Sequence, residues 1–248
     1  MADDLVIDYS EQWQETETFL RLLPGPMFSS PPTDDNGLVI RHYSTTVTRK
    51  LRDHPKMRVD LSDPDDREIV ARRVWRYGGP AYVGVLLSRI EPMTRWRKRR
   101  DGRRFPVQYY SRTNRDIEYR QALWCDIEGD DIDDQFRRLA RFALRPTMVV
   151  WSGNRSIQAY WVLEQSVTDG TFRRLMDGLC DRLHGNRNVL RPMQQMRLPG
   201  GVHEKTGERA ALVLAGERFY RARQIADAIA LSSEKCGGST ASGMRCDA

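Results

Sequence analysis

The chain has 248 residues, of which 40% are hydrophobic and 30% are charged, and its formal net charge is +6. These values fit a globular chain with a sizeable core, and they exclude a short peptide module, an intrinsically disordered chain and a membrane protein. The first ten residues carry three aspartates instead of a basic start and an apolar stretch, so we expect no secretory signal, a cytoplasmic location and no membrane partner. The four cysteines lack CxxC spacing, which favours buried thiols over a disulfide framework or a zinc ribbon.

The N-terminal third predicts two helices followed by a buried strand. The first helix is expected near Glu11 to Leu22. The second begins near Pro64, where aspartates suit a helix N-terminus, and ends at Gly78-Gly-Pro80. Ala81 to Leu87 then has the apolar run of a buried strand. Because no repeat or composition shift separates residues 1–80 from the rest, we interpret them as an α-rich part of the same domain.

A basic tract, Arg95-Trp-Arg-Lys-Arg-Arg-Asp-Gly-Arg-Arg104, follows and is expected to form a loop or a loose hairpin. It contains seven basic residues and one acidic residue, so its net charge of +6 equals that of the whole chain. Such a segment favours a polyanionic partner, because neutralised phosphates release condensed counterions. The alternative is a solvated basic loop. The candidate DNA-binding residues are Arg95, Trp96, Arg97, Lys98, Arg99, Arg100, Arg103 and Arg104.

From Gln121 onward, apolar patterns predict a regular series of strands and helices. The expected strands are Ala122–Glu128, Met148–Trp151, Ile157–Leu163 and Ala210–Leu214. The expected helices are Asp133–Ala143, Thr171–Leu183 and Ala222–Leu231. The buried face of the first of these helices is expected to hold Phe136, Leu139, Ala140 and Ala143. Residues 232–248 are rich in Gly and Ser and are expected to form a flexible tail. The whole order predicts an α+β fold.

Two acidic residues stand two positions apart in the strand expected at 122–128. Asp126 and Glu128 therefore project from one face of that strand, about 6.6 Å apart along the chain axis. Hard oxygen ligands at this spacing suit Mg²⁺ or Mn²⁺. The pair alone is a weak signal, since solvent-facing acids at a strand edge are equally common. Asp131 or Asp133 can cap the next helix.

Two further segments are candidates for holding phosphate oxygens. Ser152-Gly-Asn-Arg-Ser156 offers free amides, hydroxyls and a cation in a turn, although an ordinary hairpin turn explains the same residues. The segment from Arg197 to Lys205 places a cation on either side of a Pro-Gly bend, although a strand end with a surface turn is the alternative. We interpret His184 and His203 as surface residues. The sequence has no GxxxxGK[ST] segment, which excludes a P-loop ATPase or helicase.

In this order, the three segments resemble the motifs of the archaeo-eukaryotic primase superfamily, the primase-polymerases of plasmids, viruses and other mobile elements. LWCDIEGD is similar to the acidic first motif, RPTMVVWSGNRSIQAYWVLE to the second, and QQMRLPGGVHEKTG to the Arg-Leu-Pro-Gly segment. AYVGVLLSRI resembles the strand that precedes the first motif. The resemblance covers residues 81–214. It implies a modified RNA-recognition-like core with a mainly antiparallel sheet, in one catalytic domain at 81–231.

The resemblance also implies roles for individual residues. Asp126 and Glu128 would be the catalytic metal ligands, with Asn186 at the position of a third ligand. The implied nucleotide-binding residues are Ser152, Gly153, Asn154, Arg155, Gln158, Arg197 and Lys205. The chain departs from the family in having an amide at Gln158 where histidine is usual and at Asn186 where a carboxylate is usual. Asp181 is the substitute if the alignment shifts. An amide is an uncharged phosphate ligand and a weaker Mg²⁺ ligand than a carboxylate.

Three hypotheses follow. The first is a template-directed DNA primase-polymerase in the replication of a plasmid, phage or other mobile element. It would use a single-stranded DNA template, nucleoside triphosphates, two Mg²⁺ or Mn²⁺ ions and a separate replicative helicase as partner. The second is a catalytically decayed relative that binds single-stranded or origin DNA and recruits replication factors. The third is a metal-dependent nuclease. The first requires both acids on one face of a central strand, opposite the hairpin turn.

Overall fold

The computed structural model describes residues 12–26, 44–48, 57–88, 92–98, 102–110, 117–129 and 131–234. Its helices are α1 (Trp13–Leu22), α2 (Pro64–Tyr77), α3 (Ile132–Arg141), α4 (Asp169–Leu183) and α5 (Ala222–Glu234), with a short 3-10 helix at Arg187–Val189. Its strands are β1 (Ser44–Thr48), β2 (Met57–Asp60), β3 (Tyr82–Gly84), β4 (Leu87–Ser88), β5 (Pro92–Lys98), β6 (Arg104–Tyr110), β7 (Ile117–Tyr119), β8 (Ala122–Glu128), β9 (Met148–Trp151), β10 (Ser156–Val162), β11 (Gln195–Arg197) and β12 (Ala211–Ala215). Across these ranges, no helix is both long enough and apolar enough to cross a membrane.

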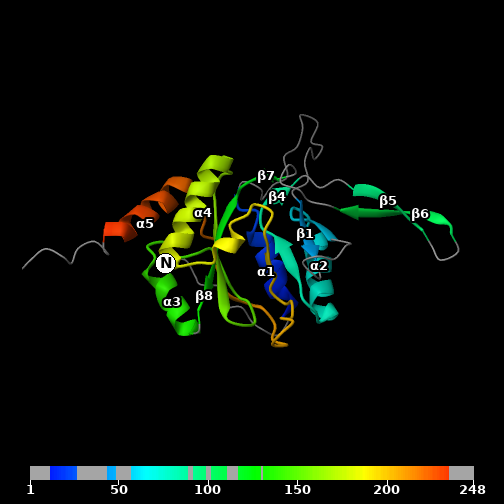
Figure 1. The fold of residues 1–248 in the computed structure, drawn as a ribbon, viewed down its shortest axis with the longest axis horizontal. Helices are drawn as coiled ribbons and strands as arrows, with labels where there is room; N and C mark the ends of the chain where they lie inside the picture. Colours follow the sequence, from blue (N-terminus) through cyan, green and yellow to red (C-terminus); the bar gives the residue numbers. More distant parts are fainter. Residues whose placement is uncertain are drawn as a thin grey trace, which may run out of the picture.

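The described strands pair into two main sheets and a separate hairpin. One sheet has the order β11-β3-β1-β4-β7, with β2 paired to β1, and the other has the order β12-β9-β10-β8. The pairings between these strands are antiparallel, as predicted. Figure 1 shows α3, α4 and α5 on the side of β8, and α2 on the other side of the molecule next to β1. The fold is therefore α+β, with antiparallel sheets and packed helices.

Strand β8, which carries the acidic pair, lies at the edge of its sheet, so the prediction of a central strand is wrong. Among the described residues, a loop lies along its outer edge. Ile127 forms an isolated bridge with Gly185, and the Asn186 backbone N–H donates to the Asp126 carbonyl over 2.8 Å. This loop satisfies part of the strand edge and brings residues from the end of α4 next to the acidic pair.

A continuous hydrophobic core includes residues from both sheets and from all five described helices. Trp124 of β8 and Tyr160 of β10 are fully buried. The ring of Phe19 in α1 packs edge-to-face on Tyr160, with ring centroids 5.2 Å apart. The N-terminal helix α1 is thus built into the same core as the strands that carry the candidate site.

The ends of α2 follow from its sequence. Asp63 is the N-cap residue, and its side chain accepts a hydrogen bond from the Asp65 backbone N–H, with Pro64 in the first turn. Gly78 ends the helix with a φ of 60°, in the left-handed region that glycine enters without strain. Both signals were expected, and the helix has the predicted bounds.

The strand expected at 81–87 is split into β3 and β4, and the side chain of Gln121 gives the reason. Its amide Nε2 donates to the carbonyls of Val85 and Leu23, over 2.9 and 3.3 Å. Its Oε1 accepts from the Leu87 backbone N–H over 3.2 Å. A fully buried amide therefore satisfies backbone groups at the break, where the strand ladder is interrupted.

Helix α3 differs from the prediction in its buried face and in its end. Phe136 is 39% exposed, and Ala140 and Ala143 are also exposed, whereas Gln135 and Leu139 are buried. The reason is that Gln135 makes three hydrogen bonds to the adjoining backbone, described below, which turns its face of the helix inward. The helix ends at Arg141, and Phe142 packs beneath it against Trp161.

Short elements account for the other differences. Strands β1, β2, β7 and β11 have five residues or fewer and were not predicted. The basic tract forms the predicted hairpin, β5 with β6. Helix α5 extends to Glu234, so residues 232–234 of the expected tail are helical, and residues 235–248 lie outside the described ranges.

We predict that Gln121→Ala lowers the free energy of unfolding by about 2–4 kcal/mol, because it leaves buried backbone groups of Val85, Leu87 and Leu23 without their partner. Urea unfolding followed by circular dichroism measures this. The matched control Gln165→Ala removes an exposed glutamine and should stay within about 0.5 kcal/mol of wild type. Equal stabilities of the two variants would contradict the role assigned to Gln121.

Candidate active site

The register of β8 and β10 places four polar side chains on one face. Asp126 stands opposite Gln158, and Glu128 stands opposite Ser156. Directly opposed residues in an antiparallel pair project from the same face of the sheet. All four side chains accordingly line a cavity of about 770 Å³. The two acids therefore project from one face of the sheet and line the same cavity as the turn at 152–156, as the sequence analysis required.

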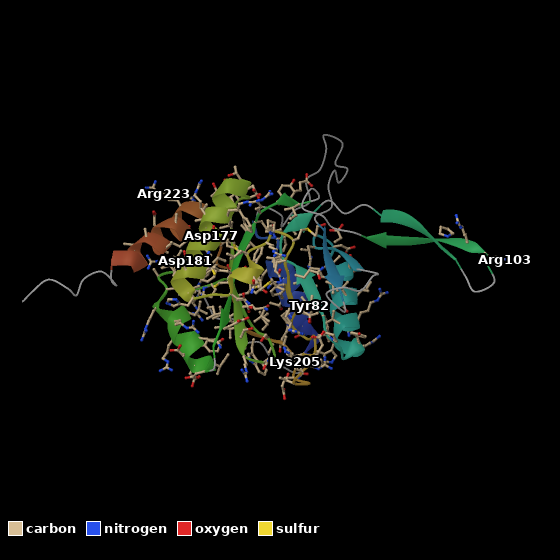
Figure 2. The ribbon with its side chains drawn as sticks, in the orientation of Figure 1. Tyr82, Arg103, Asp177, Asp181, Lys205 and Arg223 are labelled. Atoms are coloured by element: carbon tan, nitrogen blue, oxygen red, sulfur yellow. The ribbon has the colours of Figure 1, made fainter. Side chains whose placement is uncertain are left out.

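The cavity lies between the two sheets and is lined by the segments that the sequence singled out. Tyr82 of β3 and Arg197 of β11 come from one sheet, and β8 and β10 come from the other. The remaining polar lining residues include Ser152, Asn154, Arg155, Gln194, Gln195, His203, Glu204 and Lys205. Figure 2 shows Tyr82 near the centre of the molecule and Lys205 at the lower edge of the same region. Residues far apart in the chain thus meet around one space.

Asp126 is buried without full compensation of its charge. The residue is 7% exposed, and its Oδ1 atom accepts no hydrogen bond from the described residues. Burial, with a further contribution from the charge of Glu128, raises the pKa of the Asp126 carboxyl to about 6. A buried carboxylate oxygen without a donor is costly unless a cation or a proton approaches it. The arrangement fits a divalent cation held between Asp126 and Glu128.

The donor set fits one hard cation better than two. Mg²⁺ is commonly held by one or two carboxylates together with phosphate oxygens and waters, which Asp126 and Glu128 can provide. No cluster of three or more His, Cys, Asp or Glu side chains that could hold a metal occurs among the described residues. Asn186, which the resemblance places at the third-ligand position, donates from Nδ2 to Glu128 Oε1 over 2.7 Å but is not among the residues that line the cavity. Its Oδ1 accepts from the Asn188 backbone N–H over 2.9 Å and caps the 3-10 helix. Asn186 therefore presents an N–H donor to Glu128, while its oxygen accepts from the backbone of the 3-10 helix.

Close packing of Gly185 against β8 sets the position of Asn186. A Cβ atom at Gly185 would lie 2.3 Å from the Cys125 sulfur, so only glycine allows this approach. The Trp124 indole N–H also donates to the Val189 carbonyl over 2.9 Å, which holds the end of the 3-10 helix.

The alternative ligand Asp181 lies on α4, is 62% exposed on its side chain and pairs with Arg187. Asp181 does not line the cavity.

Gln135 is a positioning residue that the sequence analysis missed. From α3, its Nε2 donates to the carbonyls of Gly129 and Arg155 over 3.1 and 2.6 Å, and its Oε1 accepts from the Ile157 N–H over 3.0 Å. These bonds tie the end of β8 to the turn before β10. No local pattern could identify it, because a buried glutamine is recognised only by partners that are distant in sequence.

The two segments predicted to contact phosphate, at 152–156 and 197–205, pack against each other. The Thr206 hydroxyl donates to the Gly153 carbonyl over 2.7 Å. Gly153 has a φ of 80°, and a Cβ atom there would lie 2.9 Å from the Glu208 carbonyl oxygen. Glycine is therefore required where the turn meets the second segment. The candidate residues at 152–155 and 197–205 form one unit in space.

Arg197 is held by Tyr82, which stands next to it on the neighbouring strand. The Arg197 guanidinium donates to the Tyr82 hydroxyl over 3.1 Å and lies 4.8 Å from the centre of its ring. Tyr82 in turn donates to the Glu204 carboxylate over 3.1 Å. Glu204 is 3.8 Å from Arg197 and is half exposed. Arg197 is only 8% exposed, so it is a preorganised cation whose present counterion is a weakly held carboxylate.

The two histidines differ in position. His184 is exposed at the end of α4, as expected, where it takes a left-handed backbone conformation with a φ of 51°. His203 is partly exposed, which agrees with a surface position, and it also lines the cavity beside Glu204 and Lys205. Its place in the cavity lining was not predicted, because the turn that carries it packs against residue 153, which is distant in sequence.

The described part of the basic hairpin does not line the cavity. In Figure 2, Arg103 lies near the far end of the projecting hairpin, well away from Tyr82 and Lys205. Arg103 and Arg104 are exposed. The side chains of residues 95–98 and all of residues 99 and 100 lie outside the described part of the structure. A role for this hairpin would therefore be in binding nucleic acid outside the site.

Solved structures share this fold. The primase-polymerase domain of cyanophage S-2L matches with a TM-score of 0.53 and 18% identity, over 76% of this chain and 89% of that chain. The catalytic domain of primase RepB′ in complex with initiator DNA matches with a TM-score of 0.53 and 9% identity, over 92% and 96%. A second RepB′ structure matches with a TM-score of 0.51 and 9% identity, over 92% of this chain and 64% of that one. Neither a protein-family model nor a curated protein sequence matches the chain.

At these identities the comparisons establish the fold. The chain has the single-domain α+β fold of phage and plasmid primase-polymerase catalytic domains. The fold implied by the resemblance, which rested on short motifs, is thereby confirmed in three dimensions.

We predict that Asp126→Asn stabilises the metal-free protein at neutral pH. The native carboxyl has a pKa of about 6, above the ordinary value near 3.8, so the native state binds more protons than the unfolded state between about pH 4 and 6. The free energy of unfolding of wild type therefore falls as pH rises through this window. That of Asp126→Asn does not fall for this reason, because asparagine does not ionise. The difference between variant and wild type should grow by about 1–3 kcal/mol from pH 4 to pH 7.5.

Urea unfolding in EDTA at both pH values measures this difference. Asp227→Asn, an exposed acid on α5, is the matched control and should show no such growth. A difference that stays constant with pH would contradict the raised pKa of Asp126.

Proposed function

We propose that this chain is a template-directed nucleotidyltransferase that starts or extends a strand as a DNA primase-polymerase. The observation that carries the proposal is that Asp126 and Glu128 share one cavity with Arg197, Lys205 and the turn at 152–156. Carboxylates facing cations across one space suit a metal-bound triphosphate. The fold common to the cyanophage and RepB′ proteins supports this, and the RepB′ complex contains initiator DNA.

In the proposed reaction, a 3′-hydroxyl attacks the α-phosphorus of a nucleoside triphosphate, a new O–P bond forms and pyrophosphate leaves. Arg197 and Lys205 would hold phosphate oxygens, and Ser152, Asn154 and Arg155 would do so from the opposing turn. Gln158 would add an uncharged contact. Asp126 and Glu128 would hold Mg²⁺ or Mn²⁺, which when bound neutralises phosphate charge and lowers the pKa of the attacking hydroxyl. Gln135 and Asn186 would keep these groups in place.

The site also favours a second candidate function, a catalytically decayed relative that binds single-stranded or origin DNA and recruits replication factors. The specific observation is that Asn186 presents an N–H group to Glu128 where a further oxygen ligand would hold a second cation. Both functions use the same fold, and they differ in whether product forms.

We predict that purified protein with a single-stranded DNA template, labelled nucleotides and Mn²⁺ or Mg²⁺ makes product. Asp126→Ala with Glu128→Ala should reduce the product by more than about a hundredfold, because cation binding supplies several kcal/mol of charge stabilisation. Asp227→Ala, which removes an exposed acid from α5, is the matched control and should retain activity. Tight DNA binding without product would favour the decayed relative. Shortening of the template would indicate a nuclease.

We also predict a DNA-binding role for the hairpin. Replacing Arg97, Lys98, Arg99 and Arg100 with alanine should weaken single-stranded DNA binding. It should also reduce the slope of log affinity against log salt by up to about 3, at about 0.7 for each lost phosphate contact. Fluorescence anisotropy at several salt concentrations measures both.

The matched control removes four positive charges elsewhere. Arg173, Arg174, Arg221 and Arg223 are exposed on or next to α4 and α5, and Figure 2 shows Arg223 at the opposite end of the molecule from Arg103. This control should leave the slope nearly unchanged. An unchanged slope in the hairpin variant would reject the role.

A further inference from the structure

His203 lines the cavity, yet the mechanism above gives it no task. It is fixed in a tight turn after the Pro-Gly bend. Its backbone N–H donates to the Glu208 carbonyl over 2.7 Å, and its own carbonyl accepts from Gly207 over 2.9 Å. Val202 forms a bridge with Arg209 at the base of this turn. These backbone hydrogen bonds therefore fix the direction of the His203 Cα–Cβ bond.

The same turn packs against the β9–β10 turn. The His203 Cβ atom lies 3.2 Å from where a Cβ at Gly153 would stand. The Thr206 hydroxyl donates to the Gly153 carbonyl. The imidazole is thus placed where the two phosphate-contacting segments meet, with Arg197 and Lys205 lining the same cavity.

The hydrogen bond at one ring nitrogen determines what the other can do. His203 Nδ1 accepts from the Lys205 backbone N–H over 3.2 Å, so it carries no proton. The neutral ring then carries its hydrogen on Nε2 and is a donor there. Burial and the charge of Arg197, together with that of Lys205, lower the pKa of the imidazole against the opposing effect of Glu204. The ring is therefore neutral at neutral pH.

We propose that His203 is a triphosphate-binding residue whose Nε2–H donates a hydrogen bond to a phosphate oxygen. This rests on the proposed function, in that the cavity takes a nucleoside triphosphate. Arg197 and Lys205 provide attraction, and the neutral ring adds a contact whose direction is set by the turn. A fixed donor at the meeting point of both segments helps to orient the phosphate chain.

Two conservative variants separate this role from a structural one. His203→Asn keeps an acceptor near the position of Nδ1 for the Lys205 N–H but removes the outer donor. His203→Gln places an amide N–H at the reach of Nε2. The measurement is calorimetric binding of dATP and of inorganic tripolyphosphate, each with Mg²⁺, together with the melting temperature of each variant.

We expect His203→Asn to weaken binding of both ligands by about tenfold or more, since a hydrogen bond to a charged group is lost. Its melting temperature should stay close to that of wild type, and His203→Gln should bind within about threefold of wild type. Wild-type affinity in His203→Asn overturns the proposal, as does a loss confined to dATP, because tripolyphosphate has only the phosphates. A parallel fall in melting temperature and affinity in both variants also overturns it in favour of a structural role.

The experiments distinguish failure of the proposed nucleotidyl transfer from failure of the role proposed for His203. Triphosphate binding that depends on the residue 203 donor, in a wild-type protein that makes no product, would support His203 as a ligand and reject nucleotidyl transfer. Wild-type protein that binds neither ligand would reject both.

Discussion

The buried carboxylate of Asp126 is the constraint on which the candidate site depends. Removing a carboxylate from water without giving each oxygen a donor is unfavourable, so the surrounding fold must hold it there. Three sets of contacts do so. The β8–β10 ladder fixes its face, Gln135 ties the end of β8 to the following turn, and Gly185 lets the chain cross the outer edge of β8. Under the proposed function, a bound cation would offset this cost of burial, which would link local instability to function.

The opposite wall of the cavity depends on the N-terminal part of the chain. The Thr16 hydroxyl of α1 donates to the Pro199 carbonyl over 2.7 Å, and a Cβ atom at Gly200 would lie 2.8 Å from that hydroxyl. Tyr82, on the strand paired with β11, holds the Arg197 guanidinium. The cations that face the acidic pair are therefore positioned by residues more than a hundred positions earlier. The site is a product of both sheets.

The sequence predicted the parts of the fold that depend on local signals. The period-two placement of Asp126 and Glu128, the Asp63 cap and the apolar run of β8 each act within a few residues, and the structure agrees with them. The buried face of α3, the break after β3 and the place of His203 in the cavity lining were not predicted. Each depends on a hydrogen bond or a close contact made by a residue distant in sequence, namely Gln135, Gln121 or Gly153. The departures at Gln158 and Asn186 could be seen in the sequence, but only the structure gives the direction of the Asn186 amide.

The most direct test of the central claim is a crystal structure of the protein soaked with Mn²⁺ and a nucleoside triphosphate, with the metal located by its anomalous scattering. The account predicts an ion bound to Asp126 Oδ1 and to Glu128, with the phosphate chain between it and the segment from Arg197 to Lys205. Density for the ion elsewhere, or a phosphate chain outside this cavity, would contradict it.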